Sequence, residues 1–334
     1  MRVLIIGGTG LISSGVAKHL NERGASVVMY NRGARASAPI VGVHHIPGDR
    51  NDFGAFEDRL ANERFDVVID MICFSEAQAQ SAVRAFSGRC EQFILCSTVC
   101  TYGVNIAREV LIDESFTPEP ISTYARSKLS CERILLGAAD EGRFQTTVIR
   151  PSSTYGPGAP LIDNLEFDPP TWDRIEKGLP VLCAGDGLGL WQATHRDDVG
   201  KLFAYAALNQ KTYGQVYNAT CERVMTWSEY YRRAAEALGQ RAKVLFMPAR
   251  WIVAHEPSRF GLLAEITQYH GAYSSKKARR DVPEFRCEIE FTSGARETLL
   301  DRKRSGRWRL GTGDAVYEPM IEKALRAGVE PVEL

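Results

Sequence analysis

The stretch VLIIGGTGLISSGVAKHL, residues 3–20, decides the fold. An apolar strand runs into Gly7, Gly8 and Gly10, and a segment with helical spacing follows at once. Glycines at such a turn let the backbone approach a pyrophosphate, whose charge is met by the N-terminus of the helix. Ser13 stands where a third glycine usually lets the helix pack closely on the strand, and its small side chain should preserve that packing. This order predicts a dinucleotide-binding site.

Strand-like and helix-like segments keep alternating up to about residue 150. We expect strands near 2–7, 26–30, 43–49, 65–72, 92–98 and 145–151, and helices over 11–23, 53–62, 76–86 and 123–140. Apolar strands joined by helical crossovers imply a parallel sheet that is covered on both faces. The prediction is therefore an α/β protein. A Rossmann domain with a doubly wound parallel sheet covers 1–155. A smaller C-terminal substrate-binding lobe covers most of 156–334, with some segments returning to the Rossmann domain.

The composition is that of an ordinary globular protein, with 41 basic and 41 acidic residues in 334. Zero net charge argues against nucleic acid as the main partner, because phosphate contacts need a basic excess. The eight cysteines contain no C-x-x-C pair, which favours a reduced cytoplasmic protein without a metal site. No apolar run approaches the roughly 18 residues of a membrane helix. We expect a cytoplasmic homodimer.

The end of the second predicted strand bears on the choice of cofactor. An acidic residue there would bind the ribose 2′-hydroxyl of NAD, but MYNRGARAS offers Asn31, Arg32 and Arg35 instead. Arg32 could pair with the 2′-phosphate of NADP, or it could stack on the adenine or remain solvated. The cofactor is therefore NAD or NADP, with a preference for NADP. Asp49, in PGDRND, is a candidate adenine contact.

Hydride transfer is indicated by STVCTYG (97–103) and YARSK (124–128). Tyr124 and Lys128 are one helical turn apart and share a helix face. A lysine ammonium near a phenol should lower the pKa of the phenol. The Thr98 hydroxyl could then hydrogen-bond the substrate oxygen while Tyr124 moves the proton.

These motifs give the chain a resemblance to the extended short-chain dehydrogenases/reductases of the NAD-dependent epimerase/dehydratase group. It is carried by GGTGLIS, GD at 48–49, STVCTYG, YARSK, IRPSSTYGPG, THRDDV and YSSKKARRDV. The resemblance implies a Rossmann domain with a substrate lobe, a nucleotide-sugar substrate, and Thr98, Tyr124 and Lys128 as the catalytic set. The candidate cofactor-binding residues are Gly7, Gly10, Leu11, Ile12, Asn31, Arg32, Asp49, Arg50, Cys73, Tyr124, Lys128, Pro151 and Ser153.

The sequence departs from the dehydratases directly after Thr98. Dehydratases of the family typically carry Asp-Glu there, whereas this chain has Val99 and Cys100. Epimerisation needs no such pair. If the strand continued, Thr98 and Cys100 would point to the same face, and Cys100 could act as an acid/base in an unusual dehydratase. If the strand ended earlier, Cys100 would be a small buried residue.

A second departure concerns the substrate. Trp191 stands where relatives that bind a diphosphate often have an arginine, and it could stack on a base or a sugar. The candidate substrate-binding residues are Thr98, Val99, Cys100, Asn164, Trp191, Arg196 and Arg279.

Four functions remain open on the sequence. The first is nucleotide-sugar epimerisation or a related redox step with NAD(P). The second is NADPH-dependent reduction, or dehydrogenation, of a sugar-like or secondary-metabolite carbonyl. The third is RNA binding on a retained fold, because LWQATHRDDVGKLFAYAAL is similar to the chloroplast stem-loop RNA-binding branch. The fourth is the unusual dehydratase with Cys100.

Overall fold

The computed structural model describes residues 1–33, 43–104 and 110–334, which divide into two compact units. Unit 1 contains Met1–Thr154, Arg196–Thr220 and Tyr273–Cys287. Unit 2 contains Tyr155–His195, Cys221–Ala272 and Glu288–Leu334. Two later segments of the chain thus return to the N-terminal unit.

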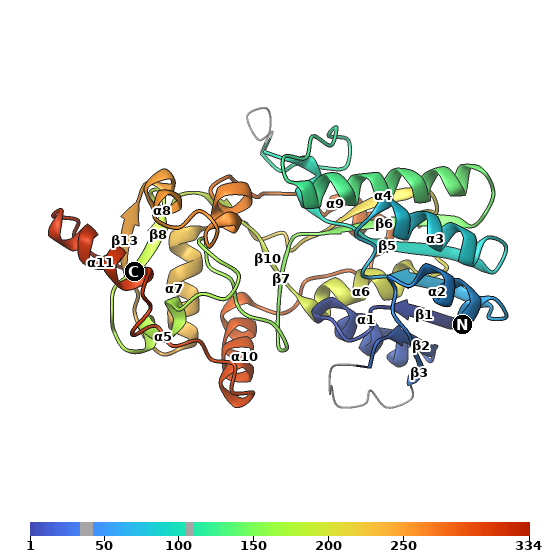
Figure 1. The fold of residues 1–334 in the computed structure, drawn as a ribbon, viewed down its shortest axis with the longest axis horizontal. Helices are drawn as coiled ribbons and strands as arrows, with labels where there is room; N and C mark the ends of the chain where they lie inside the picture. The colour runs from blue at the N-terminus through green and yellow to red at the C-terminus, as the bar shows by residue number, and fades with distance from the viewer. Residues whose placement is uncertain (34–42, 105–109) are drawn as a thin grey trace. The chain divides into compact units, whose positions relative to one another are not determined.

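Unit 1 is built, within the described residues, on a seven-stranded sheet in the order β11-β6-β5-β4-β1-β2-β3 (Figure 1). Every neighbouring pair in it is parallel. The strands are β1 (Arg2–Ile6), β2 (Ser26–Asn31), β3 (Val43–Pro47), β4 (Phe65–Asp70), β5 (Cys90–Cys96), β6 (Gln145–Pro151) and β11 (Gln215–Ala219). The order reverses between β1 and β4, and ligands of such sheets bind at the carboxyl ends of the strands at this point. The predicted doubly wound Rossmann sheet is confirmed.

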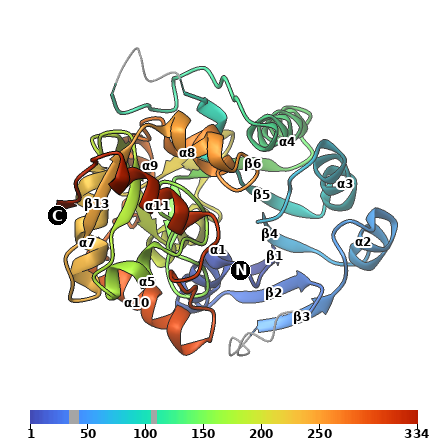
Figure 2. The ribbon, with the colours of Figure 1, turned by 60° about the vertical axis from the view of Figure 1, so that its left-hand side comes forward.

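Helices cover both faces of this sheet because alternate strand residues point to opposite sides. On one face, Val3 and Ile5 pack with residues of α1 (Leu11–Glu22), α6 (Arg196–Ala206) and α9 (Lys276–Asp281). On the other, Leu4 and Ile6 pack with α2 (Phe53–Leu60), α3 (Glu76–Phe86) and α4 (Thr123–Asp140). Figure 2 shows α2, α3 and α4 together along one side of the strands.

Helices α1 and α6 approach so closely that side chains cannot fit between them. A Cβ atom on Gly15 would lie 2.4 Å from the carbonyl oxygen of Arg196, and one on Gly200 would lie 2.4 Å from the carbonyl carbon of Gly15. The short 3₁₀ helices η1 (Val99–Tyr102) and η2 (Gln210–Thr212) complete unit 1, and β7 (Ser153–Tyr155) runs across the boundary between the units.

Unit 2 has its own core. One sheet contains β8 (Val181–Ala184), β13 (Lys243–Met247) and β14 (Val332–Glu333). The short strands β9 (Leu190–Trp191) and β12 (Met225–Thr226) pair separately, and β10 (Ala193–His195) is a further short strand outside that sheet. Its helices are α5 (Thr171–Glu176), α7 (Trp227–Ala237), α8 (Ala249–His255), the π-helix η3 (Leu263–Thr267), α10 (Phe291–Arg304) and α11 (Tyr317–Arg326). Aromatic residues of α7, among them Trp227 and Tyr230, fill the space between these elements. None of the described helices is long and apolar enough to span a membrane.

Candidate functional site

The glycine loop between β1 and α1 has the backbone geometry that the sequence predicts. Gly7 adopts a φ of 84°, a conformation that favours glycine. A Cβ on Gly8 would lie 2.5 Å from Met29 Cγ, so a side chain there would displace Met29. Ser13 is buried, and its Oγ donates a hydrogen bond of 2.8 Å to the Gly7 carbonyl, which keeps helix and loop in close contact.

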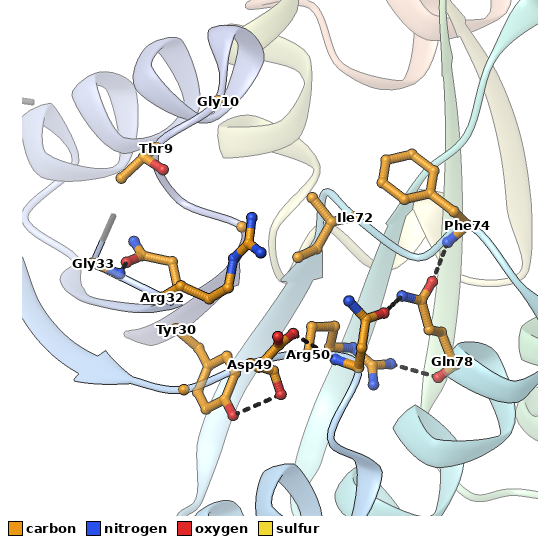
Figure 3. A pocket seen from close by; sticks show the side chains of 14 residues that line it. Thr9, Gly10, Tyr30, Arg32, Gly33, Asp49, Arg50, Ile72, Phe74 and Gln78 are labelled. Carbon is orange, nitrogen blue, oxygen red and sulfur yellow. Dashed lines mark hydrogen bonds between the residues drawn. The ribbon is translucent and has the colours of Figure 1, made fainter. Parts of the chain in front are cut away.

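A pocket of about 400 Å³ opens beside this loop at the carboxyl ends of the strands (Figure 3). It is lined by Gly7, Thr9, Gly10, Tyr30, Asn31, Arg32, Gly33, Gly48, Asp49, Arg50, Asn51, Ile72, Phe74 and Gln78. Because α1 begins after Gly10, no side chain caps its first backbone N–H groups, and they can face an anion. The loop, the helix start and the position at the switch between β1 and β4 all fit a bound dinucleotide.

The end of β2 presents a free positive charge to the pocket. Arg32 is exposed and forms no hydrogen bond or ion pair with any described residue. Figure 3 shows its side chain extending toward the middle of the pocket. Asn31, by contrast, is engaged, since its Oδ1 accepts hydrogen bonds from the Gly33 N–H at 2.8 Å and from the His45 ring. Arg35 lies outside the described residues.

Asp49 and Arg50 both line the pocket, but only one of them has a free charge. Asp49 is exposed, and its Oδ1 accepts a hydrogen bond of 2.9 Å from the Asn51 N–H. The Arg50 guanidinium is buried, lies 4.1 Å from the centre of the Phe56 ring, and has its Nε 3.5 Å from Asp70. Arg50 therefore lies at the bottom of the pocket, and its charge interacts with Asp70 and with the Phe56 ring.

The connection after β4 corrects the prediction for Cys73. The Cys73 side chain is fully buried in the core beside α4, whereas its neighbours Ile72 and Phe74 line the pocket. β4 ends at Asp70, and strand alternation ends with it: Met71 packs on one face of the sheet, as Val67 and Ile69 do, whereas Cys73 packs on the other. Other candidate cofactor residues also lie outside the pocket lining: Leu11 and Ile12 begin α1, Pro151 is buried at the end of β6, and Ser153 is half-buried in β7.

The three predicted catalytic residues all belong to unit 1 and lie at the ends of β5 and α4. Ser122 caps α4 by accepting a hydrogen bond from the Ala125 N–H at 3.1 Å, which places Tyr124 and Lys128 in its first two turns. Tyr124 is 46% exposed, and Thr98 forms a hydrogen bond with its side chain. Lys128 is 1% exposed, and its Nζ donates to the carbonyls of Cys73 at 2.8 Å and Cys96 at 2.6 Å.

The pKa of Tyr124 differs from the expectation. Burial of the phenol raises its pKa above the ordinary value; the Cys96 and Cys100 thiols add to this, and the hydrogen bond with Thr98 opposes it. The sequence predicts that Lys128 lowers this pKa. In the structure the Lys128 ammonium is directed at two backbone carbonyls, and the phenol retains its proton at neutral pH.

The segment after β5 corrects two further expectations. β5 ends at Cys96, and Thr98 is the N-cap of η1, with its Oγ1 accepting a hydrogen bond of 3.2 Å from the Cys100 N–H. Cys100 therefore does not share a strand face with Thr98, although the turn of η1 keeps its thiol within hydrogen-bonding reach of Thr98. Burial raises the pKa of Cys100, which makes the thiol a poorer base. Val99 is packed in an apolar cluster with Tyr102 and is not available to a substrate.

A buried ion pair holds this segment against α4. Glu132 accepts hydrogen bonds from Arg150 at 2.9 Å (Nε to Oε1) and 2.5 Å (Nη2 to Oε2), and Ser97 Oγ also donates to it. The Arg150 guanidinium lies 4.6 Å from the centre of the Tyr102 ring. The pair therefore contacts both flanks of the Thr98 segment. The sequence reasoning missed Glu132, although its position four residues after Lys128 puts both on one helix face.

In unit 2, the structure corrects the predictions for Asn164 and Trp191. Asn164 is fully buried, and its amide is engaged: Nδ2 donates to the Ala184 carbonyl at 3.0 Å, and Oδ1 accepts from the Tyr231 hydroxyl at 3.1 Å. Trp191 is buried and stacks on Trp227 with ring centres 4.7 Å apart. Both side chains belong to the core of their unit.

The two arginine candidates lie in unit 1. Arg196 begins α6, with its Nε 3.4 Å from Asp197, and Arg279 is exposed on α9. No group of His, Cys, Asp and Glu side chains in the described part of the chain could hold a metal ion.

Sequence reasoning also missed several residues of the pocket wall, of which Phe74 lies nearest to the catalytic set. Its ring centre is 6.3 Å from that of Tyr124 and 4.7 Å from Lys128 Nζ. Strand alternation gave no signal for Phe74, because the residue lies in the connection beyond the end of β4.

Comparison with known proteins agrees with this architecture. The model of the NAD dependent epimerase/dehydratase family matches residues 3–220. The chain is 29% identical to the 2'-dehydrokanamycin reductase of Streptomyces kanamyceticus over 97% of its own length and 89% of that protein. It is 26% identical to the chloroplast stem-loop binding protein of 41 kDa b of Arabidopsis thaliana, over 78% of this chain and 67% of that protein.

Among solved structures, the fold is similar to that of UDP-glucose 4-epimerase from Thermotoga maritima, with a TM-score of 0.72 and 21% identity. The superposition covers 91% of this chain and 99% of the epimerase. With the family model spanning the whole Rossmann sheet and the glycine loop in place, the chain belongs to the NAD dependent epimerase/dehydratase family of enzymes.

Proposed function

We propose that this protein is an NADPH-dependent reductase that converts a ketone on a sugar-like substrate to an alcohol. One observation carries the proposal. Tyr124 is partly exposed, its protonated phenol is hydrogen-bonded to Thr98, and it lies one helical turn from the buried ammonium of Lys128. This set lies next to Phe74, which is part of the wall of the dinucleotide pocket.

In this mechanism, the Thr98 hydroxyl and the Tyr124 phenol bind the carbonyl oxygen of the substrate and orient it. A dinucleotide held by the glycine loop and the pocket residues would supply the hydride for the carbonyl carbon. Tyr124 donates its proton to the oxygen, and the nearby positive charge of Lys128 stabilises the phenolate that remains. A raised pKa suits this direction, because the proton is in place at neutral pH. An epimerase must first oxidise its substrate, for which Tyr124 would have to act as a base.

The preference for NADPH rests on the end of β2. Arg32 offers to the pocket a guanidinium that forms no ion pair with a described residue, and no acidic residue stands beside it at 31–33 to repel a 2′-phosphate. A guanidinium binds phosphate oxygens through charge-assisted hydrogen bonds.

The substrate class follows from unit 2 and from the curated relative. Asn164 and Trp191 are packed in the core, so neither offers the polar contact expected for a nucleotide diphosphate. The relative that is similar over most of the chain is named for reduction of an oxidised aminoglycoside. We infer a ketone on an aminoglycoside or on another sugar ring.

Nucleotide-sugar epimerisation is the second candidate, because Thr98, Tyr124 and Lys128 are also the residues that such a cycle requires. Epimerisation differs from the proposed reduction in that the cofactor returns to its starting oxidation state in every turnover. RNA binding is supported by the similarity to a stem-loop binding protein, but the equal numbers of acidic and basic residues disfavour it.

Two measurements on the purified protein separate the enzymatic candidates. A reductase should consume NADPH in a 1:1 ratio with the alcohol formed from an oxidised aminoglycoside. An epimerase should interconvert UDP-glucose and UDP-galactose without net consumption, and should release tightly held NAD when denatured. Interconversion without NADPH consumption would refute the reductase proposal.

The cofactor preference has its own test. Replacing the Arg32 guanidinium with a methyl group (Arg32→Ala) should weaken NADPH binding by about ten- to a hundredfold, the value of one charge-assisted hydrogen bond. NADH binding should hardly change. Arg64→Ala is the matched control, since Arg64 is also exposed but precedes β4 at the opposite end of the strand. Equal weakening of both cofactors would show that Arg32 does not select between them.

A further inference from the structure

Phe74 presents an apolar ring to the dinucleotide pocket. It follows β4 and precedes α3, and its side chain is 46% exposed at the edge of the pocket (Figure 3). A single exposed apolar residue is common and needs no explanation by itself. The contacts of this ring with two residues of the catalytic set do need one.

The backbone beneath the ring is firmly held. The Phe74 N–H donates to Gln78 Oε1 at 2.6 Å, and Ser75 and Gln78 form a reciprocal capping box at the start of α3. Gln78 Nε2 in turn donates to Asn51 Oδ1 at 2.9 Å, which ties α3 to the loop after β3. The ring thus projects from a fixed point and not from a free loop.

The ring faces both α4 residues of the catalytic set. Lys128 Nζ lies 4.7 Å from the ring centre, within the range of a cation–π contact. The Tyr124 ring centre lies 6.3 Å away with an interplanar angle of 45°, within the range of an aromatic pair. One side chain therefore contacts the ammonium and the phenol ring together.

Lys128 is buried and forms no ion pair with a described residue, so a neighbour of this kind lowers the cost of burying its charge. Its ammonium has three N–H donors, and the carbonyls of Cys73 and Cys96 accept from it. Among the described residues, no carboxylate forms an ion pair with it. A buried charge without compensation is costly, and the negative face of the Phe74 ring supplies part of what is missing.

We propose that Phe74 is a positioning residue, whose ring holds the Lys128 ammonium and the Tyr124 ring in their working arrangement and screens the ammonium from water. This inference rests on the proposed function, in which Tyr124 transfers the proton and Lys128 supports it.

Two substitutions distinguish the effect of the π face of the ring from the effect of its apolar volume. Phe74→Leu keeps apolar volume but removes the π face, and Phe74→Tyr keeps both. We expect Phe74→Leu to lower kcat for ketone reduction by about tenfold, since a desolvated cation–π contact is worth about that much. KM for the ketone should change by less than about threefold, and Phe74→Tyr should restore kcat.

A second readout does not depend on activity. An amine-reactive reagent followed by peptide mapping reports how fast the Lys128 amine is labelled. In Phe74→Ala the amine becomes accessible to water and to the reagent, so we expect labelling of Lys128 to rise several-fold, whereas Phe74→Tyr should match the wild type. Lys18, which is half-exposed on α1, serves as the internal reference and should be labelled equally in all variants.

The proposal is overturned if Phe74→Ala leaves the labelling of Lys128 at the wild-type rate. Equal kcat in the Leu and Tyr variants would overturn it as well. If the wild-type protein reduces no ketone, the proposed function fails, but the labelling of Lys128 still decides whether Phe74 covers the ammonium.

Discussion

The buried pair of Glu132 and Arg150 allows a prediction with a definite sign. Both side chains are at least 95% buried, and the carboxylate accepts two hydrogen bonds from the guanidinium and one from Ser97. Glu132→Gln removes the negative charge and turns an amide toward Arg150. The remaining neighbour of the guanidinium is the Tyr102 ring, which cannot replace a carboxylate. We expect the free energy of unfolding to fall by about 3–5 kcal/mol, the usual effect of breaking a buried pair.

The double variant tests the physical reason. Glu132→Gln with Arg150→Met also removes the stranded positive charge, so it should be more stable than Glu132→Gln alone. Urea denaturation of the two single variants and the double variant measures the coupling energy. Activity should fall in Glu132→Gln even where the protein is folded, because the pair holds the segment of Thr98 against α4.

The chain offers a matched control on its surface. Arg84 and Glu57 form the same two-pronged pair, with distances of 3.0 and 2.7 Å, but their side chains are 55% and 26% exposed. Glu57→Gln should cost at most about 1 kcal/mol, because solvent screens the pair. If Glu57→Gln and Glu132→Gln had the same effect, or if the double variant were less stable than Glu132→Gln, the reasoning from burial would be refuted.

Three further predictions concern single side chains. Tyr124→Phe should lower kcat by about 10²- to 10⁴-fold, while titration with NADPH shows nearly unchanged affinity; turnover within a few-fold of the wild type would contradict the assignment. Cys100→Ser should leave turnover within about threefold, and a collapse in rate with the cofactor still bound would instead assign the thiol an acid/base role. Burial raises the pKa of Asp163 from 3.8 to about 7, so its protonated form stabilises the native state, and this contribution is lost as the pH rises from about 4 through 7. Thermal unfolding across that interval should show the loss in the wild type and a flatter profile in Asp163→Asn, and identical profiles would refute the cause.

The sequence alone was sufficient for six of the seven strands of the unit 1 sheet, but not for β11, which comes from a later segment of the chain. Apolar runs such as VLII and VVID are patterned for strands that are buried on both faces, and the helical segments between them imply parallel crossovers. The glycine loop and the spacing of Tyr124 and Lys128 are likewise local patterns. They depend on a few consecutive residues, so they can be read without knowing the partners of those residues.

The direction in which side chains point beyond the strand ends could not be predicted from such local patterns. β4 ends at Asp70, and beyond it Cys73 turns into the core on the face opposite to Met71, while Phe74 lines the pocket. β5 likewise stops at Cys96, and η1 changes the direction of Cys100. Where a strand stops depends on its neighbours in the sheet, which come from distant parts of the chain.

Tertiary structure alone also decided which polar side chains are free. Arg32, Arg50 and Arg150 are the same residue type, yet one is exposed at the pocket and the other two are buried against carboxylates at 70 and 132. The amide of Asn164 similarly forms its hydrogen bonds with Ala184 and Tyr231 inside the protein. A buried polar group must find partners, and those partners are brought within hydrogen-bonding distance only when the chain has folded.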